Sequence, residues 1–133
     1  MNLIKTRWKI FLGGVTITTC FLLNGCYDDI VVPMPTPVVT GEVSFVQDIQ
    51  PIFNASCNGV GCHNNGGVAP ILTSNAAYGA LINGGYIDTQ NPSSSGLYQW
   101  MIGNGDIDMP PSGPIASANA TVLAWIQQGA LNN

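Results

Sequence analysis

The sequence has almost no positive charge. Among its 133 residues, Lys and Arg together number 3, against 7 Asp and Glu. The basic side chains, Lys5, Arg7 and Lys9, all lie near the N-terminus, and no Lys or Arg follows them. Nucleic-acid binding and electrostatic attraction to anionic lipids both depend on Lys and Arg. The mature chain is therefore not expected to bind nucleic acid, or to attach to lipid headgroups by charge.

Charged residues of either sign are also scarce, at 8% of the chain against roughly 25% in a typical globular domain. The apolar fraction of 46% is too high, and the net charge of −4 too small, for an intrinsically disordered chain. The length allows one small domain and a targeting segment, with little room for a second core. With 16 Gly and 9 Pro, that domain is expected to be rich in loops.

The N-terminus has the features of a secretory signal. Residues 10–23 form an apolar run of 14 residues after the basic start, which is shorter than the about 20 residues that span a bilayer. The segment 23–26 (LNGC) resembles the lipobox of bacterial lipoproteins, in which the cysteine becomes the acylated first residue. The resemblance implies a signal peptide over residues 1–25 and a lipid anchor on Cys26. The alternative is simple secretion with a free Cys26.

A proline-rich segment follows this expected anchor. Residues 30–42 (IVVPMPTPVVTGE) have no helical period, and their three prolines favour an extended chain. At about 3.1 Å per residue, it would hold a domain roughly 40 Å from the lipid. Asp28 and Asp29 are either a surface-export signal of the kind found in some lipoproteins or an ordinary solvated linker. We expect residues 26–42 to be an acylated tether that anchors an exported protein to a bacterial membrane, on the periplasmic side or the outer-membrane surface.

Residues 43–133 are expected to form a small all-α domain of three to five short helices with long Gly- and Pro-rich loops. No segment alternates as a strand does. Ser44 followed by Gln47 is a capping-box pattern, and Pro51 is expected to kink the helix that they begin. A second helix is expected to begin at Thr73 or Ser74 and to end before Gly84. A third is expected to begin at residues 93–95, with Leu97, Trp100 and Met101 on its inner side. The last is expected to begin at Ser117 and to end at Gly129, with Val122, Trp125 and Ile126 facing inward.

Short helices and long loops bury only a modest core, so something is expected to supplement it. The segment 57–63 (CNGVGCH) has the Cys, spacer, Cys-His order of c-type haem attachment. In such a site each thiol bonds one vinyl group, and the following histidine lies beneath the iron. The four-residue spacer must bulge, which Gly59 and Gly61 permit. We therefore expect Cys57 and Cys62 to attach a haem whose iron His63, the only histidine, ligates.

The same residues allow three other interpretations. In the first, Cys57 and Cys62 would form a small-loop disulfide, as exported proteins often have. In the second, they would bind zinc together with His63, although a structural zinc site needs four ligands. A Cys-His nucleophile pair would need a third, orienting group, for which the sequence gives no support.

A second candidate iron ligand lies in a later loop. Met109 is followed by two prolines and precedes the last expected helix. Methionine opposite histidine is the ligand pair of cytochromes c. Met34 lies in the tether, and Met101 falls on the inner side of an expected helix, so neither competes well. The alternative for Met109 is a loop side chain that fills a gap.

Taken together, these elements resemble the single-haem class I cytochromes c, and the resemblance covers residues 43–133. It includes the segments 49–53 (IQPIF) and 123–130 (LAWIQQGA). The resemblance implies a cytochrome c-like fold around one covalently bound haem c. It also implies that the first and last helices cross, so that Phe45, Ile49 or Phe53 contacts Trp125. The second ring nitrogen of His63 is expected to be held by a backbone carbonyl, that of Pro70.

The function that the resemblance implies is electron transfer rather than catalysis. A membrane-tethered cytochrome would pass single electrons to a redox partner whose surface is neutral or basic, because the domain itself is acidic. Without Lys or Arg, the haem propionates must be solvated or bonded by neutral donors, for which Trp100, Tyr86 and Tyr98 are candidates. The alternatives are a haem-free surface binding module closed by a Cys57–Cys62 disulfide, and a haem enzyme with an open distal site.

Overall fold

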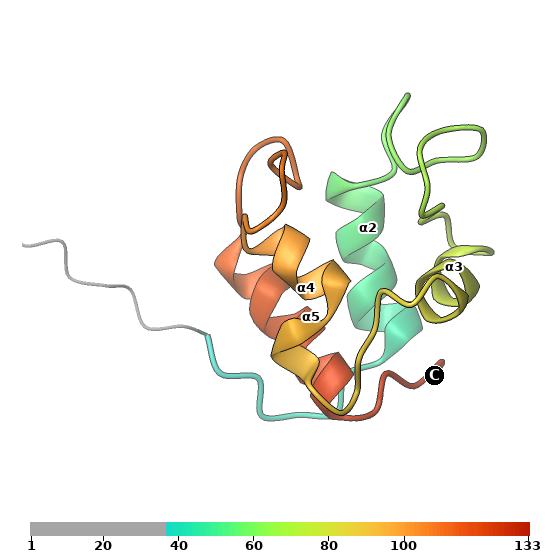
Figure 1. Ribbon diagram of the computed structural model, residues 1–133. Coiled ribbons are helices and arrows are strands. Elements are labelled where there is room, and N and C mark those ends of the chain that lie inside the picture. Colours follow the sequence, from blue (N-terminus) through green and yellow to red (C-terminus); the bar gives the residue numbers. More distant parts are fainter. Residues whose placement is uncertain (1–36) are drawn as a thin grey trace, which may run out of the picture. The chain divides into compact units, whose positions relative to one another are not determined.

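A computed structural model describes residues 37–133 (Figure 1). The expected signal peptide over residues 1–25, Cys26 and the tether up to residue 36 lie outside this range. Within it every regular element is a helix, which confirms the all-α class. None of these helices has the length and apolar character needed to span a bilayer. The elements are η2 (Phe45–Ile49), a π-helix; α2 (Gln50–Ser56); α3 (Ala77–Asn83); η3 (Pro92–Ser94), a 3-10 helix; α4 (Gly96–Met101); and α5 (Ala116–Gln127).

The first helix begins at the predicted cap. The Ser44 hydroxyl accepts the backbone N–H of Gln47 at 3.2 Å. The reciprocal bond of the capping box comes from Asp48 instead of Gln47, since its carboxylate accepts the Ser44 N–H at 2.8 Å. The helix opens as the π-turn η2 and continues as α2, in which Pro51 occupies the first turn. Proline has no N–H to donate. Pro51 is tolerated there because it lies at the junction where π-helical hydrogen bonding gives way to α-helical hydrogen bonding.

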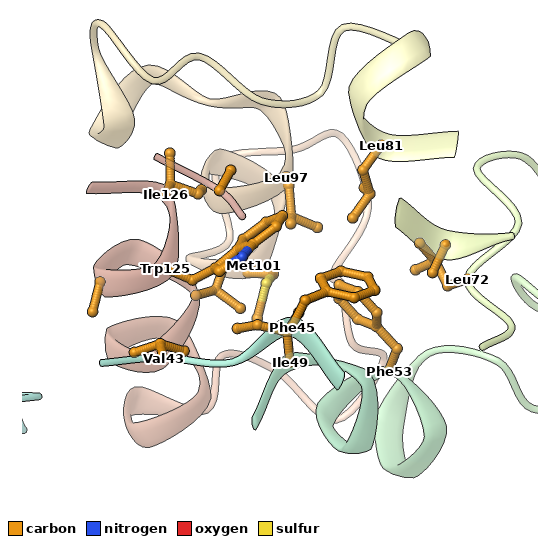
Figure 2. Packing of buried hydrophobic residues seen from close by; sticks show 14 residues of the cluster. Val43, Phe45, Ile49, Phe53, Leu72, Leu81, Leu97, Met101, Trp125 and Ile126 are labelled. Carbon is orange, nitrogen blue, oxygen red and sulfur yellow. The ribbon is translucent and has the colours of Figure 1, made fainter. Parts of the chain in front are cut away.

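The core lies where the first and last helices meet (Figure 2). The ring centroids of Phe45 and Trp125 are 5.3 Å apart, which confirms the predicted contact between these helices. Tyr78 of α3 packs edge-on against Phe45, at a centroid distance of 5.3 Å. The buried apolar residues are Val43, Phe45, Ile49, Phe53, Leu72, Ala77, Leu81, Leu97, Met101, Val122, Ala124, Trp125, Ile126 and Ala130.

Helix α5 ends as predicted and begins differently. At its end, Gly129 has φ 97°, and the N–H groups of Gly129 and Ala130 donate back to Ile126 and Trp125 at 3.0 and 2.9 Å. This is a Schellman motif, for which a left-handed glycine is suited. The prediction that Ser117 caps the helix is wrong. The cap is Ile115, and Ser117 lies within the first turn, where its carbonyl accepts the Thr121 hydroxyl at 3.0 Å.

Helix α3 differs from the prediction at its start, whereas α4 begins directly after Ser95, as predicted. Helix α3 ends before Gly84, as expected, but begins at Ala77 without a side-chain cap. The Thr73 hydroxyl is engaged by Asn75 at 2.9 Å, and only the Thr73 carbonyl accepts the N–H groups that open the turn. In α4, Leu97 and Met101 are buried as predicted, whereas Trp100, expected on the same inner side, is only half-buried and lies outside the core. The loop that follows α2 and the loop that follows α4 both extend from the same end of the helices (Figure 1).

The chain already contacts the domain before residue 43. The side-chain amide of Gln128 donates to the Gly41 carbonyl at 2.9 Å, and its oxygen accepts the Val43 N–H at 2.8 Å. Val39 packs partly against the core. One glutamine at the end of α5 thus fixes where the incoming chain joins the helices.

Candidate functional site

The two cysteines lie on one tight loop at the end of α2. Cys57 is the C-cap of α2, and its N–H donates to the Phe53 carbonyl at 2.9 Å. The spacer turns back on itself: the Cys62 N–H donates to the Gly59 carbonyl at 3.0 Å, and the His63 N–H donates to the Cys57 carbonyl at 3.1 Å. Gly61 has φ 79°, a left-handed conformation that favours glycine. The four-residue spacer therefore bulges, as predicted, and returns His63 to the level of Cys57.

The two cysteines of this loop are not joined in a disulfide. Both cysteines are half-buried free thiols. Burial, and secondarily the nearby Cys62 thiol, raise the pKa of Cys57 from 9.0 to about 11. The loop thus presents two free thiols, separated by a four-residue spacer and available for bond formation.

The His63 ring is held by two carbonyl oxygens. Its Nδ1 lies 3.0 Å from the Pro70 oxygen and 3.1 Å from the Val68 oxygen. The predicted contact with Pro70 is confirmed, and Val68 adds a second that was not predicted. Carbonyl oxygens only accept hydrogen bonds, so Nδ1 must carry the proton. In the neutral ring Nε2 then keeps its lone pair, which is the form of imidazole that binds a metal ion.

Close backbone packing shapes the segment that carries these carbonyls. The Val68 N–H donates to the Cys62 carbonyl at 2.9 Å, and the Leu72 N–H donates to the His63 carbonyl at 2.7 Å. Gly67 lies so close that a Cβ atom placed on it would overlap the Cys62 carbonyl oxygen. Only glycine fits at this position, because the obstructing atom is backbone and cannot rotate away.

Replacing Gly67 by alanine should therefore destabilise the loop around His63. We expect the free energy of unfolding to fall by about 1–3 kcal/mol, the typical cost of overpacking. The change is measured by denaturant unfolding followed by circular dichroism. Gly59→Ala is the matched control, since a Cβ on Gly59 meets no atom within 4 Å. Equal stability of the two variants would contradict the close approach at Gly67.

Met109 lies on the other loop of the same end (Figure 1). Its side chain is half-buried, between exposed Asp108 and buried Pro110. Near the start of this loop, Gly105 packs against the ring of Trp100. A Cβ atom on Gly105 would overlap that ring. The structure thus unites Cys57, Cys62 and His63 in one loop and leaves Met109 on a second.

The remaining predicted residues divide between packing and positions outside the structure. Met101 is a core side chain, 5% exposed. Tyr86 and Tyr98 pack their rings partly against the core. Their role as donors to the haem propionates stays a prediction, and Trp100 covers the base of its loop. Met34 lies outside the described residues.

Features that the sequence did not predict are the amide side chains around the loop and a groove elsewhere. Gln50 and Asn58 both donate to the Leu72 carbonyl, at 3.0 and 3.1 Å. No motif identifies such residues, because Gln and Asn are common in helices and loops.

The groove lies along η2, α2 and α3, and its lining includes Val46, Asn54 and Tyr78. None of the candidate haem-binding residues (Cys57, Cys62, His63 and Met109) lines it.

From residue 37 onward, no three His, Cys, Asp or Glu side chains gather closely enough to hold a metal ion by themselves. Comparison of the chain with protein-family models, curated proteins and solved structures finds no match. The function must therefore be argued from the chemistry of the Cys-His loop and of the second loop beside Met109.

Proposed function

We propose that the protein is a membrane-tethered c-type cytochrome that carries single electrons through one covalently attached haem c. The observation that carries the proposal is the state of His63. Its Nδ1 proton is fixed by the Pro70 and Val68 carbonyls, so Nε2 is free to bind iron. The ring directly follows two free thiols, Cys57 and Cys62, on the same tight loop. A cytochrome c-like arrangement of the four α-helices is part of this proposal.

The residues present fit such a group in their donor chemistry. Cys57 and Cys62 would form thioethers with the two vinyl groups, and His63 and Met109 would bind the iron. When bound, haem supplies a reversible one-electron couple of iron. A methionine thioether favours the ferrous state relative to a second histidine, and a carbonyl-bonded histidine is a more basic ligand that favours the ferric state. Apolar side chains around the loops would limit access of water.

The rest of the molecule supports a carrier rather than a nucleic-acid or lipid-headgroup binder. Residues 37–133 contain carboxylates and no Lys or Arg. Asp106 and Asp108 are exposed on either side of exposed Ile107, in the loop that holds Met109. A redox partner with a neutral or basic surface would complement this loop. Acylation of Cys26 would keep the exported domain at the membrane, and the propionates would be solvated or would accept hydrogen bonds from Trp100, Tyr86 or Tyr98.

Replacing Met109 by alanine tests both the carrier function and the axial ligand. We expect the midpoint potential to fall by on the order of 0.1 V, within the roughly 0.8 V range that axial ligands span. The iron should also become accessible to added imidazole or cyanide, which the wild-type protein should resist. Potentials come from spectroelectrochemical titration, and ligand binding from shifts of the Soret band.

Met101→Leu is the matched control, because it changes a buried methionine of α4 with little change of volume. Its potential should equal that of the wild type. If Met109→Ala leaves the potential unchanged and the wild-type iron binds cyanide readily, the distal site is open. The haem-enzyme alternative then replaces the carrier.

A further inference from the structure

The Leu72 carbonyl is the point at which helix α2 holds the loop beyond His63. It accepts two side-chain amides, from Gln50 Nε2 at 3.0 Å and from Asn58 Nδ2 at 3.1 Å. The Leu72 N–H meanwhile donates to the His63 carbonyl at 2.7 Å. Both the N–H and the carbonyl of Leu72 are therefore hydrogen-bonded. Leu72 lies two positions after Pro70, whose carbonyl holds the His63 ring.

Three amide side chains on α2 and just beyond it form a ladder with helical spacing. Gln50 and Asn58 each donate to Asn54 Oδ1, both at 3.0 Å, in addition to their bonds with Leu72. Residues four apart lie on one helix face, so the ladder runs along the side of α2 that faces the loop. Asn54 thereby aligns the two donors that converge on Leu72.

Gln50 is an unusual member of this ladder because it is buried. The residue is 5% exposed, and its Oε1 atom is buried without a hydrogen-bond partner. An unsatisfied buried oxygen is destabilising, and an apolar side chain of similar size would avoid that cost. The presence of the amide is explained by its donor, which reaches the Leu72 carbonyl from inside the domain.

We propose that Gln50 is a positioning residue for His63. With Asn58 it fixes Leu72, which keeps the Val68 and Pro70 carbonyls on Nδ1 and so sets the orientation and basicity of the ring. The effect on redox behaviour rests on the proposed function, whereas the effect on the ring itself does not. A firmly held Nδ1 proton makes Nε2 a more basic ligand and favours ferric iron. Loosening the carbonyls should therefore raise the midpoint potential.

The test uses Gln50→Leu, which removes the donor and keeps an apolar side chain in a buried place. The readout is the exchange of the His63 Nδ1 proton with solvent, measured by NMR on 15N-labelled full-length protein without a histidine tag. Because His63 is the only histidine, its ring signals are assigned without ambiguity. We expect exchange about fivefold faster, the factor that loss of one typical hydrogen bond produces. In haem-loaded protein the potential should rise as well.

Gln47→Leu is the matched control, since Gln47 is exposed one turn earlier on the same helix. It should leave exchange and potential unchanged. Asn58→Ala removes the second donor to the Leu72 carbonyl, whose side chain lies outside the core, and should also accelerate exchange. If Gln50→Leu does not fold, Asn58→Ala tests whether the Leu72 contacts position the His63 ring. Wild-type exchange in whichever of these two variants is folded overturns the proposal. Absence of haem would refute the proposed function. Because exchange of the Nδ1 proton is measurable with or without haem, it would still test this inference.

Discussion

Serine at both Cys57 and Cys62 should leave the purified protein without covalent haem. The two thiols are the free cysteines of the described residues, and each would supply one thioether bond. An oxygen in place of sulfur does not form the thioether, so any haem that still binds through His63 should be removed by acid and acetone. The expected effect is total loss of the Soret band from the extracted protein, measured beside wild-type protein from the same maturation-competent host.

The two single variants are the controls for this result. Each should retain haem through the remaining cysteine, with the pyridine haemochrome band moved to longer wavelength because one vinyl group stays unsaturated. Since both cysteines are free thiols on the loop that carries His63, both are expected to contribute. A double variant that keeps covalent haem would show that attachment occurs elsewhere.

Replacing Trp125 by alanine should give the largest loss of stability. The side chain is fully buried, its ring lies 5.3 Å from that of Phe45, and its Nε1 donates to the Leu131 carbonyl at 2.9 Å. Removing a buried aromatic ring costs about 3–5 kcal/mol. Domains of this size are stable by only about 5–15 kcal/mol. The variant should therefore unfold at far lower guanidinium concentration, or be unfolded at room temperature.

Val38→Ala is the control for Trp125, because Val38 is 84% exposed and its truncation should change stability by less than about 0.5 kcal/mol. Trp125→Phe should fall between the two, since it keeps most of the packing and loses the hydrogen bond to Leu131. A Trp125→Ala variant as stable as Val38→Ala would contradict the packing of the first helix on the last.

The sequence predicted features whose cause is local or strongly periodic. Ser44 caps the first helix because its hydroxyl reaches the N–H of Gln47, and Gly129 ends the last because a left-handed residue is needed there. The inward positions of Val122, Trp125 and Ile126 follow from helical spacing alone, and all three are fully buried.

Features that depend on the exact folded geometry of a turn or loop were missed. Thr73 does not cap α3 because its hydroxyl bonds to Asn75, and Ser117 does not cap α5 because that helix already begins at Ala116. The need for glycine at 67 arises from the Cys62 carbonyl across the loop, which no local pattern reveals.

For the candidate site, the Cys-His motif identified the loop. Chemical reasoning predicted a backbone carbonyl on the second ring nitrogen of His63, and the family resemblance named Pro70. The second carbonyl, of Val68, and the amides of Gln50 and Asn58 were not predicted. Their roles depend on how residues 64–72 fold back over α2. The ligand role of Met109 stays a prediction, since the structure places it on a separate loop of the same end (Figure 1).

Acid–acetone extraction of the mature wild-type protein tests the covalent attachment of haem most directly. Protein produced in a host with a c-type haem maturation system should keep its Soret band in the precipitate, and its mass should exceed that of the polypeptide by one haem. A colourless precipitate, with Cys57 and Cys62 either alkylated by a thiol reagent or joined in a disulfide, would contradict the account.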